Sequence, residues 1–289
     1  MSITLRSARE DGANRLIEAG VETGRREAVW LLSHLLGIDP ALMLARWEDN
    51  LPLNVWQAYQ DLISRRVRRE PLQYILGSTT FCGLTIEVNP SVLIPRPETE
   101  ELVGWALELL PETTTCSVVD LGTGSGCIAL AIKSQRPLAD VFGYEIETKA
   151  LKTAISNAKR LNLDVTFAQA DMLDPSLLAV HKESADLIVS NPPYVCTDES
   201  EDLQPEVVQY EPHAALFSAG DPLSYYAAIG TFGRKRLKPD GTLLLESHAD
   251  RAEDVAALLT ALGYDGVSIR QDLAGLSRMV AARVSKQDT

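Results

Sequence analysis

A regular alternation of apolar strands and amphipathic helices, which begins after Pro97, constrains the fold of this 289-residue chain more than any other feature. The spacing predicts helices at residues 98–110, 127–134 and 149–161 and strands at 117–121, 141–145, 164–168, 185–190, 242–246, 266–270 and 279–283. Strands separated by helices join as a parallel sheet through right-handed crossovers. We therefore expect an α/β domain with a doubly wound, mainly parallel, Rossmann-like sheet.

The N-terminal quarter has a different pattern. Its apolar residues recur at helical spacing, as at Val29, Leu32 and Leu36. Residues 85–88 then alternate polar and apolar side chains as a half-buried strand does, between glycines and prolines that favour turns. The sequence therefore predicts a small all-helical domain at residues 1–75, a β-hairpin linker at 76–97 and the α/β domain at 98–289.

The composition excludes several classes of protein. The longest apolar runs, at residues 128–132 and 187–189, fall far short of the roughly 20 residues that span a bilayer, and the N-terminus lacks the continuous apolar stretch of a secretory signal. The four cysteines and four histidines are dispersed, which indicates neither a zinc site nor a disulfide framework. We expect a cytoplasmic enzyme without a metal.

The net charge of −13 is unevenly distributed along the chain. Residues 1–75 hold 10 basic and 10 acidic residues, so the acidic excess lies in the remainder. An acidic surface disfavours a phosphate backbone, whose binding depends on neutralisation by Lys and Arg, and we expect no direct nucleic-acid substrate. The local exception is an arginine cluster, which either forms a solvated helix end or orients a partner: Arg65, Arg66, Arg68 and Arg69.

A glycine-rich turn follows the strand predicted at residues 117–121 and opens the next helix. It consists of Gly122, Thr123, Gly124, Ser125 and Gly126. Glycines there permit a tight turn and the close approach of a nucleotide-type ligand to the backbone. A pyrophosphate-binding turn has the pattern Gly-x-Gly-x-x-Gly, whereas the third glycine here comes one residue earlier. The turn therefore favours S-adenosylmethionine, with NAD as the alternative.

Three further side chains are candidates for the same ligand. Glu145 ends the second strand about 20 residues after the turn, where an acidic side chain can accept hydrogen bonds from both ribose hydroxyls. Asp171 and Met172 follow the third strand and could border the adenine, Asp171 through polar contacts and Met172 through adaptable packing. Each of the three could instead be an ordinary surface, turn or core residue.

The sequence Asn191-Pro192-Pro193-Tyr194 follows a buried strand, at the edge where open α/β sheets bind ligands. Two successive prolines fix φ and remove two N–H donors, which leaves the side-chain oxygen of Asn191 and the carbonyl of Pro192 as unopposed acceptors. These two groups can accept both hydrogens of a planar NH₂ group. A rigid turn without a ligand is the alternative.

Such a pair of acceptors answers a chemical difficulty. The nitrogen of an amide or of an exocyclic base amine has a delocalised lone pair and is a poor nucleophile. Asn191 and Pro192, the predicted catalytic residues, would hold this nitrogen in line with the methyl group and stabilise the positive charge that grows on it. Tyr194 can pack on the flat face of the acceptor.

Together these motifs resemble the peptide chain release factor glutamine methyltransferases, the PrmC or HemK family. The resemblance extends over nearly the whole chain. Its most specific blocks are Arg-Glu-Pro-Leu-Gln-Tyr-Ile-Leu-Gly at residues 69–77 and Val-Leu-Ile-Pro-Arg-Pro-Glu-Thr-Glu at residues 92–100, joined by the glycine turn with its continuation at 127–130 and by residues 190–194. The Asn-Pro-Pro-Tyr motif alone is shared with adenine and guanine methyltransferases, so the first two blocks distinguish the family.

The resemblance implies a class I methyltransferase fold and a transferase that acts in translation termination. Its acceptor would be the glutamine of the Gly-Gly-Gln motif in class I release factors, methylated on the side-chain nitrogen. The helical domain would help to dock the release factor, and the hairpin would carry Phe81 close to the active site. The cofactor would contact the glycine turn, Glu145, Met172 and Asn191, and the glutamine would contact residues 191–194.

Two kinds of alternative stay open. One is another enzyme with the same acceptor residues, either a glutamine methyltransferase of a ribosomal protein or a nucleic-acid base methyltransferase. The acidic charge and the block around Arg96 argue against the base enzyme. The other alternative is a cofactor-binding scaffold that holds a partner without turnover, which the intact Asn-Pro-Pro-Tyr motif disfavours.

Overall fold

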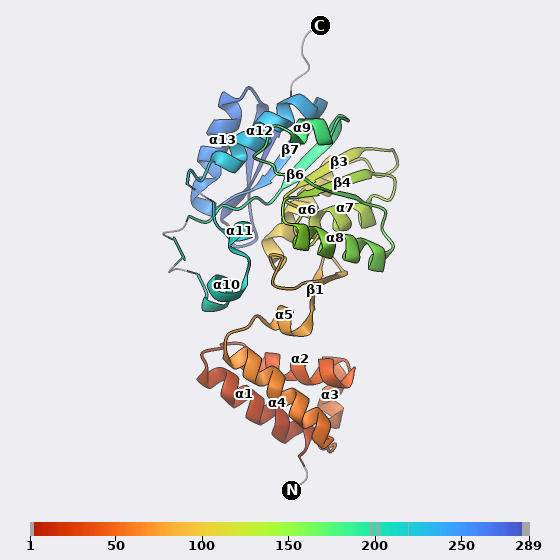
Figure 1. Ribbon diagram of the computed structural model, residues 1–289, viewed down its shortest axis with the longest axis vertical. Helices are drawn as coiled ribbons and strands as arrows, with labels where there is room; N and C mark the ends of the chain where they lie inside the picture. Colours follow the sequence, from red (N-terminus) through yellow and green to blue (C-terminus); the bar gives the residue numbers. More distant parts are fainter. Residues whose placement is uncertain (1–2, 197–198, 201–202, 219, 285–289) are drawn as a thin grey trace. The chain divides into compact units, whose positions relative to one another are not determined.

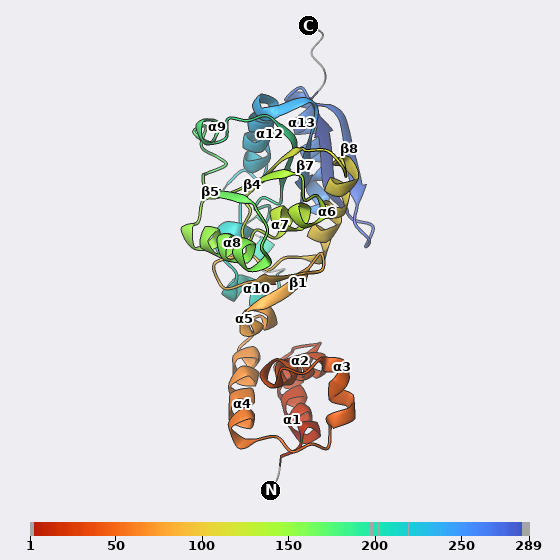
Figure 2. The same cartoon turned by 90° about the vertical axis from the view of Figure 1, so that its right-hand side faces the viewer.

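The computed structural model describes residues 3–196, 199–200, 203–218 and 220–284, and its elements are shown in Figures 1 and 2. The chain forms two compact units. The first unit comprises Met1–Ser78 together with Leu203–Tyr210, and the second comprises Thr79–Asp202 together with Glu211–Thr289. A short segment from the C-terminal half of the chain is therefore part of the N-terminal unit.

The first unit consists of helices around an apolar core. Its elements are α1 (Leu5–Glu18), α2 (Gly24–Leu36), α3 (Pro40–Met43), the 3-10 helix η1 (Leu44–Arg46), α4 (Leu53–Val67), α5 (Leu72–Leu76) and α10 (Pro205–Tyr210). Helix α1 begins at a capping box, in which the Thr4 side chain accepts the backbone N–H of Ser7. Leu16, Leu31 and Ile63 are fully buried and pack the helices together.

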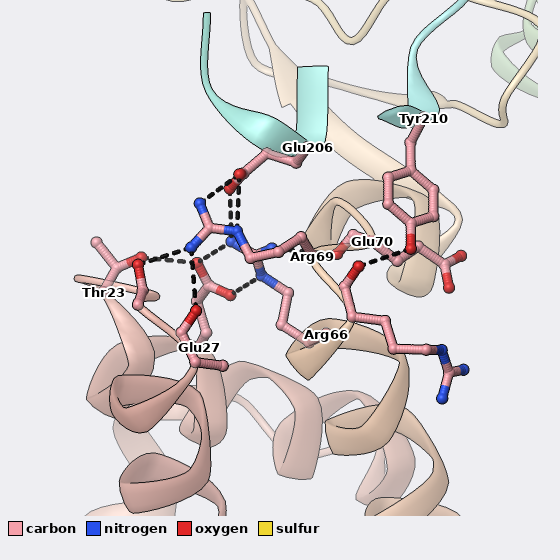
Figure 3. A network of polar contacts seen from close by, with 10 residues as sticks. Thr23, Glu27, Arg66, Arg69, Glu70, Glu206 and Tyr210 are labelled. Carbon is pink, nitrogen blue, oxygen red and sulfur yellow. Dashed lines mark hydrogen bonds and ion pairs between the residues drawn. The ribbon is translucent and has the colours of Figure 1, made fainter. Parts of the chain in front are cut away.

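A buried network of ion pairs joins α10 to the other helices of this unit (Figure 3). Arg66 donates to Glu27 at 2.6 Å and to Glu206 at 3.0 Å, and Arg69 also donates to Glu206. Tyr210 donates its hydroxyl hydrogen to the carbonyl of Arg68 at 2.7 Å. Burial opposes the ionisation of Glu206, but its hydrogen bonds from the two arginines keep its pKa below the ordinary value.

The arginine cluster is therefore not a solvated helix end, as one interpretation of the sequence had it. Arg65 is paired with Glu70, and Arg66 is only 5% exposed. Of the four arginines, Arg68 alone is exposed. The sequence could not show this pairing, because the carboxylate of Glu206 lies 140 residues away from Arg66 along the chain.

The second unit is built on a sheet of seven strands in the order β5-β4-β3-β6-β7-β9-β8. The five parallel strands are β5 (Thr166–Gln169), β4 (Asp140–Glu145), β3 (Ser117–Leu121), β6 (Ala185–Ser190) and β7 (Leu237–Glu246). Strand β9 (Ser277–Arg283) is antiparallel to β7 and to the edge strand β8 (Asp265–Gln271). A two-stranded hairpin, β1 (Ser78–Phe81) and β2 (Leu84–Glu87), precedes the sheet.

Helices cover both faces of this sheet, as Figures 1 and 2 show. One face carries α6 (Pro97–Leu109), α7 (Cys127–Gln135) and α8 (Thr148–Leu161). The other carries α9 (Leu177–Val180), α12 (Ser224–Arg236) and α13 (Ala252–Ala261), whose apolar side chains share one core with β3, β6 and β7. The helix α11 (His213–Leu216) precedes α12. The predicted fold class, a mainly parallel doubly wound sheet with a helical N-terminal part and a hairpin, is confirmed.

The strand bounds differ from the predictions where the apolar pattern is weak. Strand β5 begins at Thr166 rather than at residue 164, and β7 begins at Leu237 rather than at residue 242. The segment from Lys238 to Gly241 contains turn-forming residues and bulges out of the ladder, with Asp240 at a φ of 65°, before pairing with β6 resumes at Thr242. Within the part of the chain that the structure describes, no helix is long and apolar enough to cross a membrane.

The network around Glu206 yields a test of stability. We expect Glu206→Ala to destabilise the first unit by about 3 kcal/mol, because it leaves the buried charge of Arg66 without one of its two carboxylate partners. Urea unfolding followed by tryptophan fluorescence measures this, since Trp30, Trp47 and Trp56 lie in that unit. Glu48→Ala is the matched control, because it breaks an exposed pair worth less than about 1 kcal/mol. Equal effects of the two variants would contradict the structural role of the network.

Candidate functional site

The pairing of β3 with β6 brings the two main sequence motifs together. These strands are parallel, and the register aligns Leu121 with Ser190. The hydroxyl of Ser190 also donates to the carbonyl of Leu121 at 2.6 Å. Gly122 follows β3 and Asn191 follows β6, so these two residues lie side by side at the carboxyl edge of the sheet. Open α/β sheets bind their ligands at this edge.

The glycine turn is held by hydrogen bonds to strands β4 and β3 and to helix α8. The N–H groups of Gly122 and Thr123 both donate to the carbonyl of Tyr144 at 2.9 Å. Thr123 donates its hydroxyl hydrogen to the fully buried carboxylate of Asp120 at 2.5 Å. The side chain of Asn157 donates to the carbonyl of Ser125. The turn therefore has a fixed backbone before any ligand binds.

Gly124 faces open space in this turn. It has a φ of 55°, and a Cβ atom built on it would meet nothing within 4 Å. A Cβ atom on Gly126 would instead press on Phe167, Ala154 and Leu130, so Gly126 serves the packing of α7. Gly124 is thus the position where a ligand can approach the backbone closely.

A cavity adjoins the turn and encloses about 840 Å³, part of it open to solvent. It is lined by seven of the residues that the sequence singled out, namely Gly122, Gly124, Glu145, Asp171, Met172, Asn191 and Pro193. The other candidates do not line it: Thr123, Ser125, Gly126, Pro192, Tyr194 and Phe81. Phe81 is 1% exposed, and its contact with a substrate stays a prediction. All these residues belong to the second unit.

The carboxylate of Glu145 already performs a structural task. One oxygen accepts the N–H of Gly124 and the other accepts the N–H of Glu147, each at 2.9 Å. A carboxylate offers about four lone-pair sites, so roughly two remain for the hydroxyls of a ribose. Burial raises the pKa of Glu145, against the effect of the backbone hydrogen bonds.

The rest of the cavity fits the other parts of S-adenosylmethionine. Ile146, Met172, Leu173 and Tyr225 supply apolar and aromatic surface that suits a purine. Asp171 accepts the N–H of Leu173 at 2.8 Å and keeps further lone pairs for an amine. Among the described residues, no group of three or more His, Cys, Asp and Glu side chains is arranged to hold a metal ion.

Asn191 is held by two residues that the sequence analysis did not select. Its Nδ2 donates to the hydroxyl oxygen of Thr99 at 3.1 Å, and Thr99 donates its hydroxyl hydrogen to Glu246 at 2.7 Å. Tyr194 donates to the other oxygen of Glu246 at 3.4 Å. The signal for Glu246 was an acidic residue that ends an apolar strand, and Thr99 belongs to the block at residues 92–100.

A third residue that the sequence did not single out fixes the rim of the cavity. Glu211 is 4% exposed and accepts the N–H of Ile94 at 3.1 Å and a guanidinium hydrogen of Arg96 at 2.6 Å. Pro212, Ala214 and Ala215, which follow it, line the cavity. The block at residues 92–100 therefore holds both Asn191, the first residue of the Asn-Pro-Pro-Tyr sequence (the acceptor motif, residues 191–194), and the segment that follows Glu211. No local pattern around Glu211 revealed this, because its partners are more than 100 residues away.

The cavity beside Gly124 gives a first prediction for the ligand. Gly124→Val should abolish S-adenosylmethionine binding, because the side chain fills the cavity and a β-branched residue is strained at positive φ. Calorimetry with S-adenosylmethionine measures the loss. Gly104→Val is the control, since it also points into open space but lies on α6, away from the cavity. Tight binding of NAD to the unmodified protein would contradict the assignment of the cofactor.

The raised pKa of Glu145 gives a prediction of pH dependence. The protonated carboxyl is a weaker acceptor for ribose hydroxyls, so cofactor affinity should fall as the pH drops through the pKa of Glu145, which lies above the ordinary glutamate value. Titrations at several pH values check this. In Glu145→Gln the group cannot ionise, and this pH dependence should vanish. An identical pH profile in both proteins would show that Glu145 does not hold the cofactor.

The fold of the second unit is shared with solved methyltransferases. A methyltransferase from Pyrococcus furiosus superposes with a TM-score of 0.53 at 17% sequence identity, covering 71% of this chain and 90% of that one. A 16S rRNA methyltransferase of T. thermophilus, solved with AdoMet and guanosine, also has a TM-score of 0.53, at 19% identity, with 72% and 50% of the two chains covered. At such identities the likeness concerns the fold alone.

The likeness to sequence families is much closer. Residues 7–77 match the PrmC N-terminal domain, and residues 105–221 match the methyltransferase small domain. The release factor glutamine methyltransferase of Geobacter sulfurreducens is 40% identical over 281 residues, 97% of each chain. That of Cereibacter sphaeroides is 38% identical over 270 residues, 93% of this chain and 95% of the relative. Matches that extend over both units at this identity show that the chain belongs to the release factor glutamine methyltransferase family.

Proposed function

We propose that this protein transfers the methyl group of S-adenosylmethionine to the side-chain nitrogen of the glutamine in the Gly-Gly-Gln motif of class I peptide chain release factors. The observation that carries the proposal is the position of Asn191, which lines the cofactor cavity beside the glycine turn. The same residue presents a side-chain amide whose NH₂ group is already engaged by Thr99. Its oxygen is therefore the atom available to accept a hydrogen bond from the nitrogen that receives the methyl group.

The residues of the cavity divide into those that hold the cofactor and those that hold the glutamine. When bound, S-adenosylmethionine supplies a methyl group on a positively charged sulfur. The glycine turn would receive its amino acid part, Glu145 the ribose hydroxyls, and Asp171 and Met172 the adenine edge and face. Asn191 would lie next to the methyl group, at the boundary between the two ligands.

The acceptor amide would be bound through both of its N–H groups, one to the side-chain oxygen of Asn191 and one to the carbonyl of Pro192. The amide nitrogen is a poor nucleophile. Two hydrogen-bond acceptors fix its orientation toward the methyl group and stabilise the positive charge that develops on it. The successive prolines keep competing N–H donors away from this point. Tyr194, whose hydroxyl is held by Glu246, would offer its ring to the flat amide group.

The net charge of the chain and its similarity to known enzymes support a protein rather than a nucleic-acid base as the methyl acceptor. The net charge of −13 disfavours contact with a phosphate backbone. Relatives of similar length are release factor glutamine methyltransferases by name. The proposal includes a cytoplasmic location, where translation takes place, and a docking role for the helical unit. Docking must use residues other than Arg65, Arg66 and Arg69, because these are paired within the chain.

Mass spectrometry of purified release factors after incubation with the protein and S-adenosylmethionine tests the function directly. One added methyl group, located by fragmentation on the glutamine of Gly-Gly-Gln, is expected. Ribosomal protein and nucleic acid in parallel reactions distinguish the alternative acceptors. A short Gly-Gly-Gln peptide should be methylated with a lower kcat/KM than the intact factor, because it lacks the surface that docks. Methyl transfer to nucleic acid alone would contradict the proposal.

Variants of Asn191 separate the chemistry from binding. Asn191→Ala removes the side-chain acceptor, and loss of one oriented polar group in a transition-state site costs about 100- to 1,000-fold in turnover. Asn191→Asp retains an oxygen and adds a negative charge near the sulfonium, so its turnover should fall less and its cofactor affinity should rise. The measurements are turnover at saturating substrates and cofactor affinity. Near-normal turnover of Asn191→Ala would mean that Asn191 does not hold the acceptor nitrogen.

A further inference from the structure

A chain of hydrogen bonds runs from Asn191 into the interior of the second unit. Asn191 Nδ2 donates to Thr99 Oγ1 at 3.1 Å, and Thr99 Oγ1 donates to Glu246 Oε2 at 2.7 Å. Thr99 lies in the first turn of α6 and Glu246 ends β7, so three separate elements meet here. Thr99 is 3% exposed and Glu246 is 1% exposed, which shields both from competing water.

The hydrogens in this chain can be assigned by counting. A threonine hydroxyl has a single hydrogen, and an ionised carboxylate can only accept. While Glu246 is ionised, the hydrogen of Thr99 therefore goes to Glu246, and the oxygen of Thr99 can only accept from Asn191. If the amide of Asn191 were turned over, its oxygen would face the oxygen of Thr99 without a hydrogen between them. Such a contact between two acceptors is unfavourable, because neither oxygen has a hydrogen to offer the other.

Glu246 also holds the other end of the acceptor motif. Its Oε1 accepts from the hydroxyl of Tyr194 at 3.4 Å, so one carboxylate fixes Asn191 through Thr99 and Tyr194 directly. The backbone carbonyl of Glu246 accepts the hydroxyl hydrogen of Tyr226 on α12 at 3.2 Å, which anchors the end of β7. The polar side-chain atoms of Thr99 and Glu246 are buried and already bonded to Asn191, Tyr194 and each other, so they act on a substrate only through other residues.

The electrostatic surroundings of Glu246 come from several elements. Burial raises the pKa of Glu246 to about 7, and the hydrogen bonds from Thr99 and Tyr194 lower it. Arg278 on β9 also favours the ionised form, whereas Glu98 on α6 opposes it. The bonds from Thr99 and Tyr194 thus favour the carboxylate, the form that can receive both donors.

We propose that Thr99 and Glu246 are positioning residues, which orient the side-chain amide of Asn191 so that its oxygen faces the acceptor nitrogen. The inference rests on the proposed role of Asn191 and adds the reason why its amide presents oxygen rather than NH₂ to the cavity. A turned amide would offer donors to the donors of a glutamine NH₂ group and could not bind it. The orientation is therefore necessary for the acceptor to be held.

Substitutions of Thr99 separate orientation from packing. Thr99→Val keeps the shape of the side chain but removes the hydroxyl, so the amide of Asn191 becomes free to turn. We expect kcat to fall about 10- to 100-fold. Activity falls by this factor in metalloenzymes when a residue that orients a metal ligand by a hydrogen bond is removed. Cofactor affinity should be retained. Thr99→Ser restores the hydroxyl and should recover most of the lost kcat.

Two further variants complete the set. Glu246→Gln places an amide beside Thr99 that can either accept or donate, so Thr99 is no longer forced to accept from Asn191, and kcat should fall less than in Thr99→Val. Thr242→Val makes the same change as Thr99→Val at another buried position, on the same strand as Glu246, and should leave kcat unaltered. Normal kcat in both Thr99→Val and Glu246→Gln, or no recovery in Thr99→Ser, would overturn the proposal.

A measurement independent of turnover reports the orientation itself. In ¹⁵N-labelled protein, the side-chain NH₂ signals of Asn191 can be identified by their loss in Asn191→Asp. Their hydrogens should exchange slowly with solvent, because Nδ2 donates to a buried oxygen, and should exchange faster in Thr99→Val. Unchanged signals and exchange in Thr99→Val would overturn the proposal even if the protein methylates a different acceptor. Absence of methyl transfer by the unmodified protein would contradict the proposed function instead.

Discussion

The parallel pairing of β3 with β6 is the constraint on which the site depends. The two strands are separated by a long stretch of chain, yet the alignment of Leu121 with Ser190 brings the glycine turn and the acceptor motif to neighbouring positions at one sheet edge. Strand β4, on the other side of β3, adds Glu145 to the same edge. A shift of one residue in either pairing would separate the residues proposed to hold the cofactor from those proposed to hold the glutamine, because side chains alternate between faces along a strand.

Buried carboxylates give this arrangement its rigidity. Glu145 accepts the N–H of Gly124 and fixes the glycine turn, while Glu246 fixes the acceptor motif through Thr99 and Tyr194. Glu211 holds the rim of the cavity by accepting from Ile94 and Arg96. A buried charge without partners is costly, so each carboxylate is stable only while its donors are in place. The same energetics that keep these groups paired therefore keep the cavity in shape for its ligands.

The sequence predicted the sheet and the two motifs at its edge because their signals are local. Apolar runs mark the strands, and the glycine turn and Asn191 each follow a run directly. The supporting residues could not be predicted in this way, since Glu211 accepts from Arg96 and Glu246 accepts from Thr99, each more than 100 residues away. The pairing of Arg66 with Glu206 could not be predicted for the same reason, because Glu206 belongs to the helical unit but comes from the second half of the chain. Hydrogen bonds between residues distant in sequence produce no local pattern of polar and apolar residues from which they could be predicted.

In the proposed mechanism, Asn191 and Pro192 together accept the two hydrogens of a glutamine side-chain amide beside the cofactor. A crystal structure of the protein with S-adenosylhomocysteine and a Gly-Gly-Gln peptide tests it most directly. We expect the glutamine nitrogen within hydrogen-bonding distance of both Asn191 Oδ1 and the carbonyl oxygen of Pro192, with Asn191 Nδ2 still donating to Thr99. A glutamine bound elsewhere, or an Asn191 amide with its NH₂ group toward the glutamine nitrogen, would contradict it.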